Sequence, residues 1–158
     1  MEKNGMKRLH NERGFTLIEL MTVVIVLSLL AGISLLKFYD LRNTARAAEV
    51  TGDFRSVLIG SYNYYSDYQD WPADGAAGIV PAPLAPYLPA SANFSKGYYT
   101  LDFDNFGLGG GAYMVGVTVS STDPDLMKKL IRNLGSKSPF FSAGGTLTYI
   151  IVGSDGKS

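Results

Sequence analysis

The stretch RGFTLIEL, residues 13–20, opens the longest apolar run of the chain and decides its fold. The run from Phe15 to Leu36 holds 22 residues, and Glu19 is its only charged side chain. As a helix it would be about 33 Å long, which is enough to cross a hydrocarbon core of about 30 Å. A carboxylate is costly in hydrocarbon unless it has a partner or a task. The sequence therefore predicts a membrane-spanning helix that carries one functional charge.

Charge is distributed unevenly along this chain of 158 residues, although its net charge is zero. The first 13 residues carry four basic and two acidic side chains, a net charge of +2. Basic residues before an apolar span keep that end of the chain in the cytoplasm. We therefore expect a single-pass segment whose C-terminal part crosses the membrane.

Two ordinary explanations of the apolar run fit it less well. A secretory signal peptide has a shorter apolar region, ends in a small-residue cleavage site and rarely contains a glutamate. A plain membrane anchor fits the length of the run but leaves Glu19 unexplained.

The opening stretch resembles the class III signal of type IV pilins and type II secretion pseudopilins. The resemblance covers residues 7 to about 36: a short basic leader, Gly14, Phe15, and Glu19 at the fifth position after the glycine. It implies that a prepilin peptidase cuts between Gly14 and Phe15 and methylates the new Phe15 amine. It also implies insertion in the inner membrane, N-terminus in the cytoplasm, followed by incorporation into a periplasmic or extracellular filament.

The same resemblance gives Glu19 its task. Cleavage creates an ammonium group at Phe15, and two charges that are each costly in hydrocarbon become less costly together. By resemblance, Glu19 of an incoming subunit pairs with the Phe15 amine of the preceding subunit and sets the register of assembly. In the alternative, Glu19 satisfies the amine of its own chain.

The helix is expected to continue well beyond the membrane span. No proline occurs between Phe15 and Pro72, and apolar residues recur at helical spacing past the span. We expect one helix from about Phe15 to Asp67, apolar all round in its first half and amphipathic in its second. The second half would pack on a globular head.

The head is expected to be a small, mainly antiparallel sheet with one short helix. A proline-rich loop comes first, in which residues 84–88 can form one turn. The strand and helix patterns that follow are Tyr98–Phe103, Ala112–Ser120, a helix from Asp123 or Pro124 to Leu134, and Gly145–Val152.

The chain is thus expected to have an α+β, pilin-like fold, in which a long N-terminal helix packs on this sheet. Its expected parts are a cleaved leader (1–14), a transmembrane and filament-core helix (15–36), its amphipathic continuation (37–68) and the head with three or so strands (69–158).

Two local patterns admit ligand binding, but their contexts favour structural roles. The aromatic run of residues 62–71 could stack on a sugar, although tyrosines that line a seam between helix and head are the better interpretation. Residues 107–112 match G-x-G-x-x-A but lie between two strands, which predicts a hairpin loop and no nucleotide site.

Acidic residues in the head raise the question of calcium. The stretch from Asp102 begins like a calcium loop but has Phe106 and Tyr113 where ligands are needed. Some major pseudopilins bind calcium in the head, so Asp102, Asp104 and Asp155 are the candidate ligands. Solvated loop acids are the alternative.

Composition argues against an enzyme and against nucleic-acid binding. The chain has no cysteine, and its one histidine, His10, lies in the expected leader. Thiol catalysis and a Ser-His-Asp triad are therefore excluded. No basic stripe suited to nucleic acid occurs. We expect neither a catalytic residue nor a required cofactor.

These features predict a structural subunit of a type IV pilus-like filament, used either in a pilus or as a type II secretion pseudopilin. Its expected partners are the prepilin peptidase and methyltransferase, other pilin or pseudopilin subunits, an inner-membrane assembly platform and membrane lipid. The alternative from another class is a membrane-anchored binding module that never polymerises.

Overall fold

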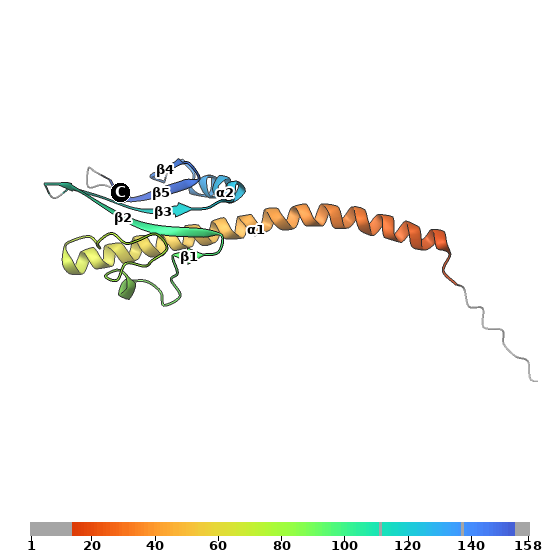
Figure 1. Cartoon of the computed structure of the whole chain (residues 1–158), viewed down its shortest axis with the longest axis horizontal. Helices are drawn as coiled ribbons and strands as arrows, with labels where there is room; N and C mark the ends of the chain where they lie inside the picture. The colour runs from red at the N-terminus through yellow and green to blue at the C-terminus, as the bar shows by residue number, and fades with distance from the viewer. Residues whose placement is uncertain (1–13, 111, 137, 154–158) are drawn as a thin grey trace, which may run out of the picture. The chain divides into compact units, whose positions relative to one another are not determined.

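The computed structural model describes residues 14–110, 112–136 and 138–153. The chain divides into two compact units, Met1–Tyr39 and Asp40–Ser158. Helix α1 (Leu17–Tyr68) begins in the first unit and ends in the second (Figure 1).

The described part of the first unit is the apolar beginning of α1. Its side chains are exposed, and this helix is long and apolar enough to cross a membrane by length and composition. Thr16 caps the helix, because its backbone and side-chain oxygens both accept a hydrogen bond from the Glu19 backbone N–H. The helix therefore begins at Leu17, two residues after the expected start at Phe15.

Hydroxyl groups within the apolar segment are satisfied by the helix itself. Thr22 donates to the Ile18 carbonyl at 2.9 Å, and Ser28 donates to the Val24 carbonyl at 2.7 Å. A hydroxyl that is bonded in this way can enter hydrocarbon without leaving a polar group unpaired.

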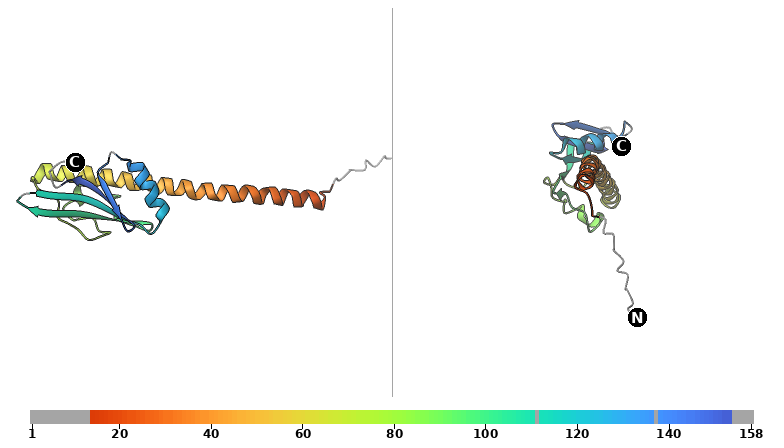
Figure 2. Two further views of the ribbon diagram at one scale, coloured as in Figure 1. Left: turned by 90° about the horizontal axis from the view of Figure 1, so that it is seen from above. Right: turned by 90° about the vertical axis from the view of Figure 1, so that its right-hand side faces the viewer.

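The second unit contains a five-stranded antiparallel sheet in the order β1-β2-β3-β5-β4 (Figures 1 and 2). The expected antiparallel sheet beside a long helix is confirmed. The elements that follow α1 are the 3-10 turn η1 (Ala85–Tyr87), β1 (Ser95–Lys96), β2 (Tyr99–Gly109), β3 (Ala112–Ser120), α2 (Pro124–Leu134), β4 (Phe140–Ala143) and β5 (Thr146–Val152).

The second half of α1 packs on this sheet through one face. Ala47, Val50, Phe54 and Val57 recur every three or four residues and are almost fully buried. They join a core cluster with inward-facing residues of the sheet, among them Leu101, Phe103, Val115, Val117, Leu147 and Ile151. Burial of this stripe, rather than intrinsic helix propensity, accounts for the stability of α1 in this unit.

Helix α2 has the ends that its sequence predicts. The Asp123 carboxylate accepts hydrogen bonds from the N–H groups of Asp125 and Leu126, and Gly135 ends the helix with a φ of 68°. Lys129 links α2 to α1. Its Nζ lies 2.7 Å from a carboxylate oxygen of Asp40 and 2.9 Å from the Thr44 hydroxyl oxygen.

The sheet differs from expectation in extent. Strand β2 continues from Phe103 to Gly109, because it pairs with β3 along its length and turns at Gly109 and Gly110, both at positive φ. The G-x-G-x-x-A match thus lies in a β-hairpin, as predicted. Strands β1 and β4 were not predicted, since two and four residues are too short for a period-2 signal.

Candidate functional site

The residues expected at the cleavage site lie outside the regular helix. Gly14 and Phe15 precede the Thr16 cap and have no helical hydrogen bonding, and the Phe15 side chain is 71% exposed. Among the described residues, no atom outside the chain neighbours of Gly14 lies within 4 Å of the position that a Cβ on Gly14 would take. The peptide bond between Gly14 and Phe15 is therefore open to an approaching enzyme. The rest of the expected leader, residues 1–13, lies outside the described residues.

Glu19 lies in the first turn of α1, four residues after Phe15. Its side chain is exposed, and the ion pairs found among the described residues do not include it. The first turn is favourable for a carboxylate, because the helix dipole places partial positive charge there. Because Phe15 lies just before the helix, an ammonium there would be close to the first turn that carries Glu19.

Apolar side chains surround Glu19 on every side of the helix. Leu17, Ile18, Leu20 and Met21 are all more than half exposed. An exposed apolar surface of this extent is not stable in water and needs lipid or other subunits to cover it. The segment can therefore insert into lipid or pack against other subunits, and it carries one charge.

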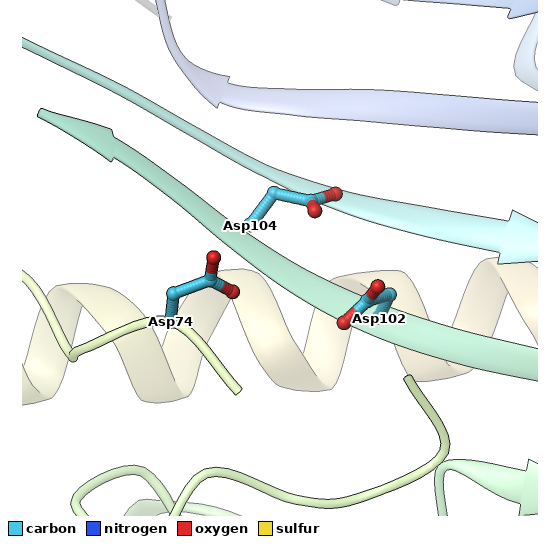
Figure 3. A group of neighbouring side chains, drawn as sticks. All are labelled: Asp74, Asp102 and Asp104. Atoms are coloured by element: carbon cyan, nitrogen blue, oxygen red, sulfur yellow. The ribbon is translucent and has the colours of Figure 1, made fainter. Parts of the chain in front are cut away.

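A second group of functional candidates is an acidic cluster in the head (Figure 3). Carboxylate oxygens of Asp74, Asp102 and Asp104 lie within 4.8 Å of one another. Asp102 and Asp104 project from the same face of β2, because residues two apart in a strand share a face. The loop after α1 is held against this strand, where the Gly78 N–H donates to the Leu101 carbonyl at 2.7 Å. This contact brings Asp74 to the other two.

Electrostatics disfavour three ionised carboxylates at this position. Burial raises the pKa of Asp102, and the nearby charges of Asp104 and Asp74 raise it further. Burial likewise raises the pKa of Asp104, although a hydrogen bond from Thr118 opposes the shift. One oxygen of Asp102, Oδ1, is buried and has no hydrogen-bond partner among the residues that the structure describes.

The cluster tests the predicted calcium ligands. Asp102 and Asp104 are brought together, whereas Asp155 lies outside the described residues. Asp74 takes part, and no spacing pattern in the sequence indicated it. Calcium prefers six to eight oxygen ligands, so three carboxylates could hold such an ion only with added water or backbone oxygens.

We predict that Asp74→Asn raises the melting temperature of the head at pH 7 in the presence of EDTA by about 1–4 °C, because it removes like-charge repulsion. A carboxylate whose pKa is raised by folding costs stability once it ionises. The gain should therefore shrink as the pH falls toward 4. Thermal unfolding followed by circular dichroism measures both effects.

Asp70→Asn is the matched control, since Asp70 is a nearby exposed carboxylate outside the cluster. An equal gain in both variants would contradict a specific repulsion. Excess calcium would remove the difference between wild type and Asp74→Asn if the three carboxylates share an ion.

The aromatic run at the end of α1 packs against the head. Tyr65 stacks on Trp71 with ring centroids 4.6 Å apart, and Tyr62 meets the same ring edge-on at 5.5 Å. Trp71 is only 8% exposed and belongs to the core cluster. This arrangement agrees with the predicted seam between helix and head.

Comparison with known proteins finds similarity at two levels. The family model of the prokaryotic N-terminal methylation motif matches residues 9–35. The chain is 37% identical over 71 residues to the fimbrial protein EcpC of Eikenella corrodens, and the match spans 45% of this chain and 46% of that protein. The chain thus spans about half the length of this curated relative.

The fold is similar to that of a solved pilin. The structure of the major type IV pilin PilA1 from Clostridium difficile matches with a TM-score of 0.50 and 18% sequence identity. The match covers 72% of this chain and 99% of the solved one.

Proposed function

We propose that this chain, a type IV pilin-like structural subunit, is inserted in the inner membrane, processed by a prepilin peptidase and polymerised through its N-terminal helix. The type IV pilins are a family of structural subunits and not of enzymes. The observation that carries the proposal is the methylation motif. Within it, one carboxylate, Glu19, lies in an exposed apolar helix shortly after the accessible Gly14–Phe15 bond.

Processing would convert the start of the chain into an assembly element. Cleavage after Gly14 removes the basic leader and leaves a new amine at Phe15, which methylation keeps as a cation. The expected span of residues 15–36 would remain in the inner membrane as a single pass, with the head on the periplasmic side.

Assembly would be driven by the apolar segment and guided by its charge. Packing with other subunits replaces lipid contacts along the helix, so shape and polar pairing decide which neighbours fit. A Glu19 carboxylate paired with the Phe15 amine of the preceding subunit removes two uncompensated charges from hydrocarbon at once. An inner-membrane platform would deliver each subunit to the growing end.

We infer a pilus rather than a secretion pseudopilus, because the matched curated sequence is a fimbrial protein. The runner-up function is a type II secretion pseudopilin, which would use the same processing and the same helix but remain in the periplasm. A membrane-anchored binding module would need neither cleavage nor Glu19.

Mass spectrometry of mechanically sheared extracellular filaments tests the proposal. A peptide that begins at Phe15 and carries one added methyl group is the expected finding in the sheared fraction. The same methylated peptide in the membrane fraction alone would point to a pseudopilin. An intact leader in cells with active prepilin peptidase would overturn the proposal in favour of the plain anchor.

A further inference from the structure

The head contains a cavity beside the second half of α1. It has a volume of about 700 Å³ and lies between α1 and the segment of residues 88–98, within the second unit. Ligand sites in proteins commonly have volumes of about 300–1,000 Å³. The cavity is therefore large enough for a small organic molecule.

The walls of this cavity are held in place by a network of charged groups. Lys96 of β1 reaches across to α1, where its Nζ lies 2.7 Å from Glu49 and 2.9 Å from Asp53. The hydroxyls of Tyr98 and Tyr99 donate to the same two carboxylates. Because hydrogen bonds from Lys96, Tyr98 and Tyr99 bridge the two walls, the cavity is preformed and a ligand need not pay for ordering them.

Hydrogen bonds and one buried side chain also fix the loop wall. Asn93 accepts a hydrogen bond from the Ser95 N–H at 2.9 Å, and the Leu101 N–H donates to the Phe94 carbonyl at 2.8 Å. The Phe94 side chain is only 2% exposed and anchors the loop in the core.

The lining combines an apolar floor with hydroxyl and amide groups. Leu88, Ala92 and Tyr98 are partly exposed and contribute its apolar surface, whereas Val57, Phe94 and Leu101 are at most 2% exposed. Ser56, Ser91, Ser95 and Asn93 contribute donors and acceptors around it. A ligand that matches both has an apolar face and several hydroxyl groups, as a sugar ring does.

The charges of the lining argue for an uncharged ligand. Lys96 is the one basic residue among the described lining residues, and its ammonium is already shared by Glu49 and Asp53. The hydrogen bond from Lys96, followed by that from Tyr98, lowers the pKa of Glu49, so this carboxylate is ionised at neutral pH. Two carboxylates against one ammonium repel an anionic ligand. Each carboxylate already accepts hydrogen bonds from Lys96 and from a tyrosine hydroxyl, so a cationic ligand would gain less here than at an unpaired acid.

We propose that this cavity between α1 and residues 88–98 binds an uncharged oligosaccharide. The remaining lone pairs of Glu49 and Asp53 and the serine hydroxyls would bond its hydroxyl groups, and its apolar face would lie on Leu88 and Tyr98. The site belongs to the folded head, so it is independent of whether the chain polymerises.

A glycan array tests the site directly. The fluorescently labelled full chain, held in micelles of a detergent without a sugar headgroup, is applied to uncharged, sialylated, sulfated and amine-bearing oligosaccharides. The expected result is binding confined to uncharged oligosaccharides. Absence of signal on every uncharged glycan, or equal signal on charged ones, would overturn the proposal.

Two neighbouring substitutions assign the signal to the cavity. Ser91→Trp places a large ring in the cavity and should reduce binding at least tenfold, whereas Ala90→Trp adds the same ring to an exposed residue outside the lining and should leave binding within twofold.

Ser56→Trp fills the cavity from the α1 wall and serves as an independent second variant. Circular dichroism checks that each variant is folded. Binding that survives both cavity-filling variants would place the glycan elsewhere and refute the site.

Discussion

Replacing Glu19 with alanine is expected to abolish filament assembly while the protein remains in the membrane. Removing one partner of a buried ion pair costs about 3–5 kcal/mol, because the other charge is left uncompensated. At about 1.4 kcal/mol for each tenfold change, the loss at each subunit contact is on the order of a hundredfold or more. Immunoblots of the sheared extracellular fraction measure the loss of filaments. Immunoblots of the membrane fraction measure how much of the subunit remains in the membrane.

Thr22→Ala is the matched control for Glu19→Ala. Thr22 lies one turn further along the same exposed helix face, and its hydroxyl is already bonded to the Ile18 carbonyl. The substitution removes a polar group without removing a charge, so filaments should form normally. Normal filaments in Glu19→Ala would refute pairing with Phe15, and loss of the variant from the membrane would indicate an insertion defect instead.

The N-terminal segment could be predicted from sequence because its signals are local. Helix length, apolar composition and the position of Glu19 after Gly14 are all read along the chain, and the structure places Phe15 and Glu19 in exposed positions at the start of one long helix. The one local difference is the start of α1 at Leu17, where the Thr16 cap fixes the first turn.

The arrangement of the head depends on contacts between distant residues. The acidic cluster forms because the loop after α1 pairs with β2 and carries Asp74 to Asp102 and Asp104. The Lys96 bridge to Glu49 and Asp53 likewise joins residues that no sequence pattern links. Such sites follow from register and packing, which binary pattern and propensity do not encode.

The length of β2 also depends on contacts between distant residues. The predicted strand ended at Phe103. Asp104 and the four glycines of residues 107–111 have low strand propensity. Pairing with β3 over its whole length outweighed this preference, and Asp102 and Asp104 were accommodated on the face opposite Phe103. Local composition predicted the turn correctly and its start too early.

Replacing Phe54 with alanine is expected to unfold the head at a temperature about 10–20 °C lower. Phe54 is 2% exposed at the centre of the buried α1 face, and its ring stacks on Tyr149 of β5 with centroids 5.5 Å apart. Loss of a buried phenylalanine ring costs about 3–5 kcal/mol, through lost transfer free energy and the cavity left behind. Since domains of this size are stable by only about 5–15 kcal/mol, the change removes a large share of that stability.

Near-ultraviolet circular dichroism of the full chain in micelles measures this transition, because Trp71 lies in the same core as Phe54. Ile59→Ala is the matched control, since Ile59 lies on the same helix but is 58% exposed. A surface truncation of this kind changes stability by about 0.5 kcal/mol or less. Equal melting temperatures for the two variants would show that α1 does not pack on the sheet through its Phe54 face. A selective loss of stability in Phe54→Ala, together with loss of filaments in Glu19→Ala, would establish that one helix has two separate roles, with the head folding on residues of its second half and assembly depending on Glu19 in its first turn.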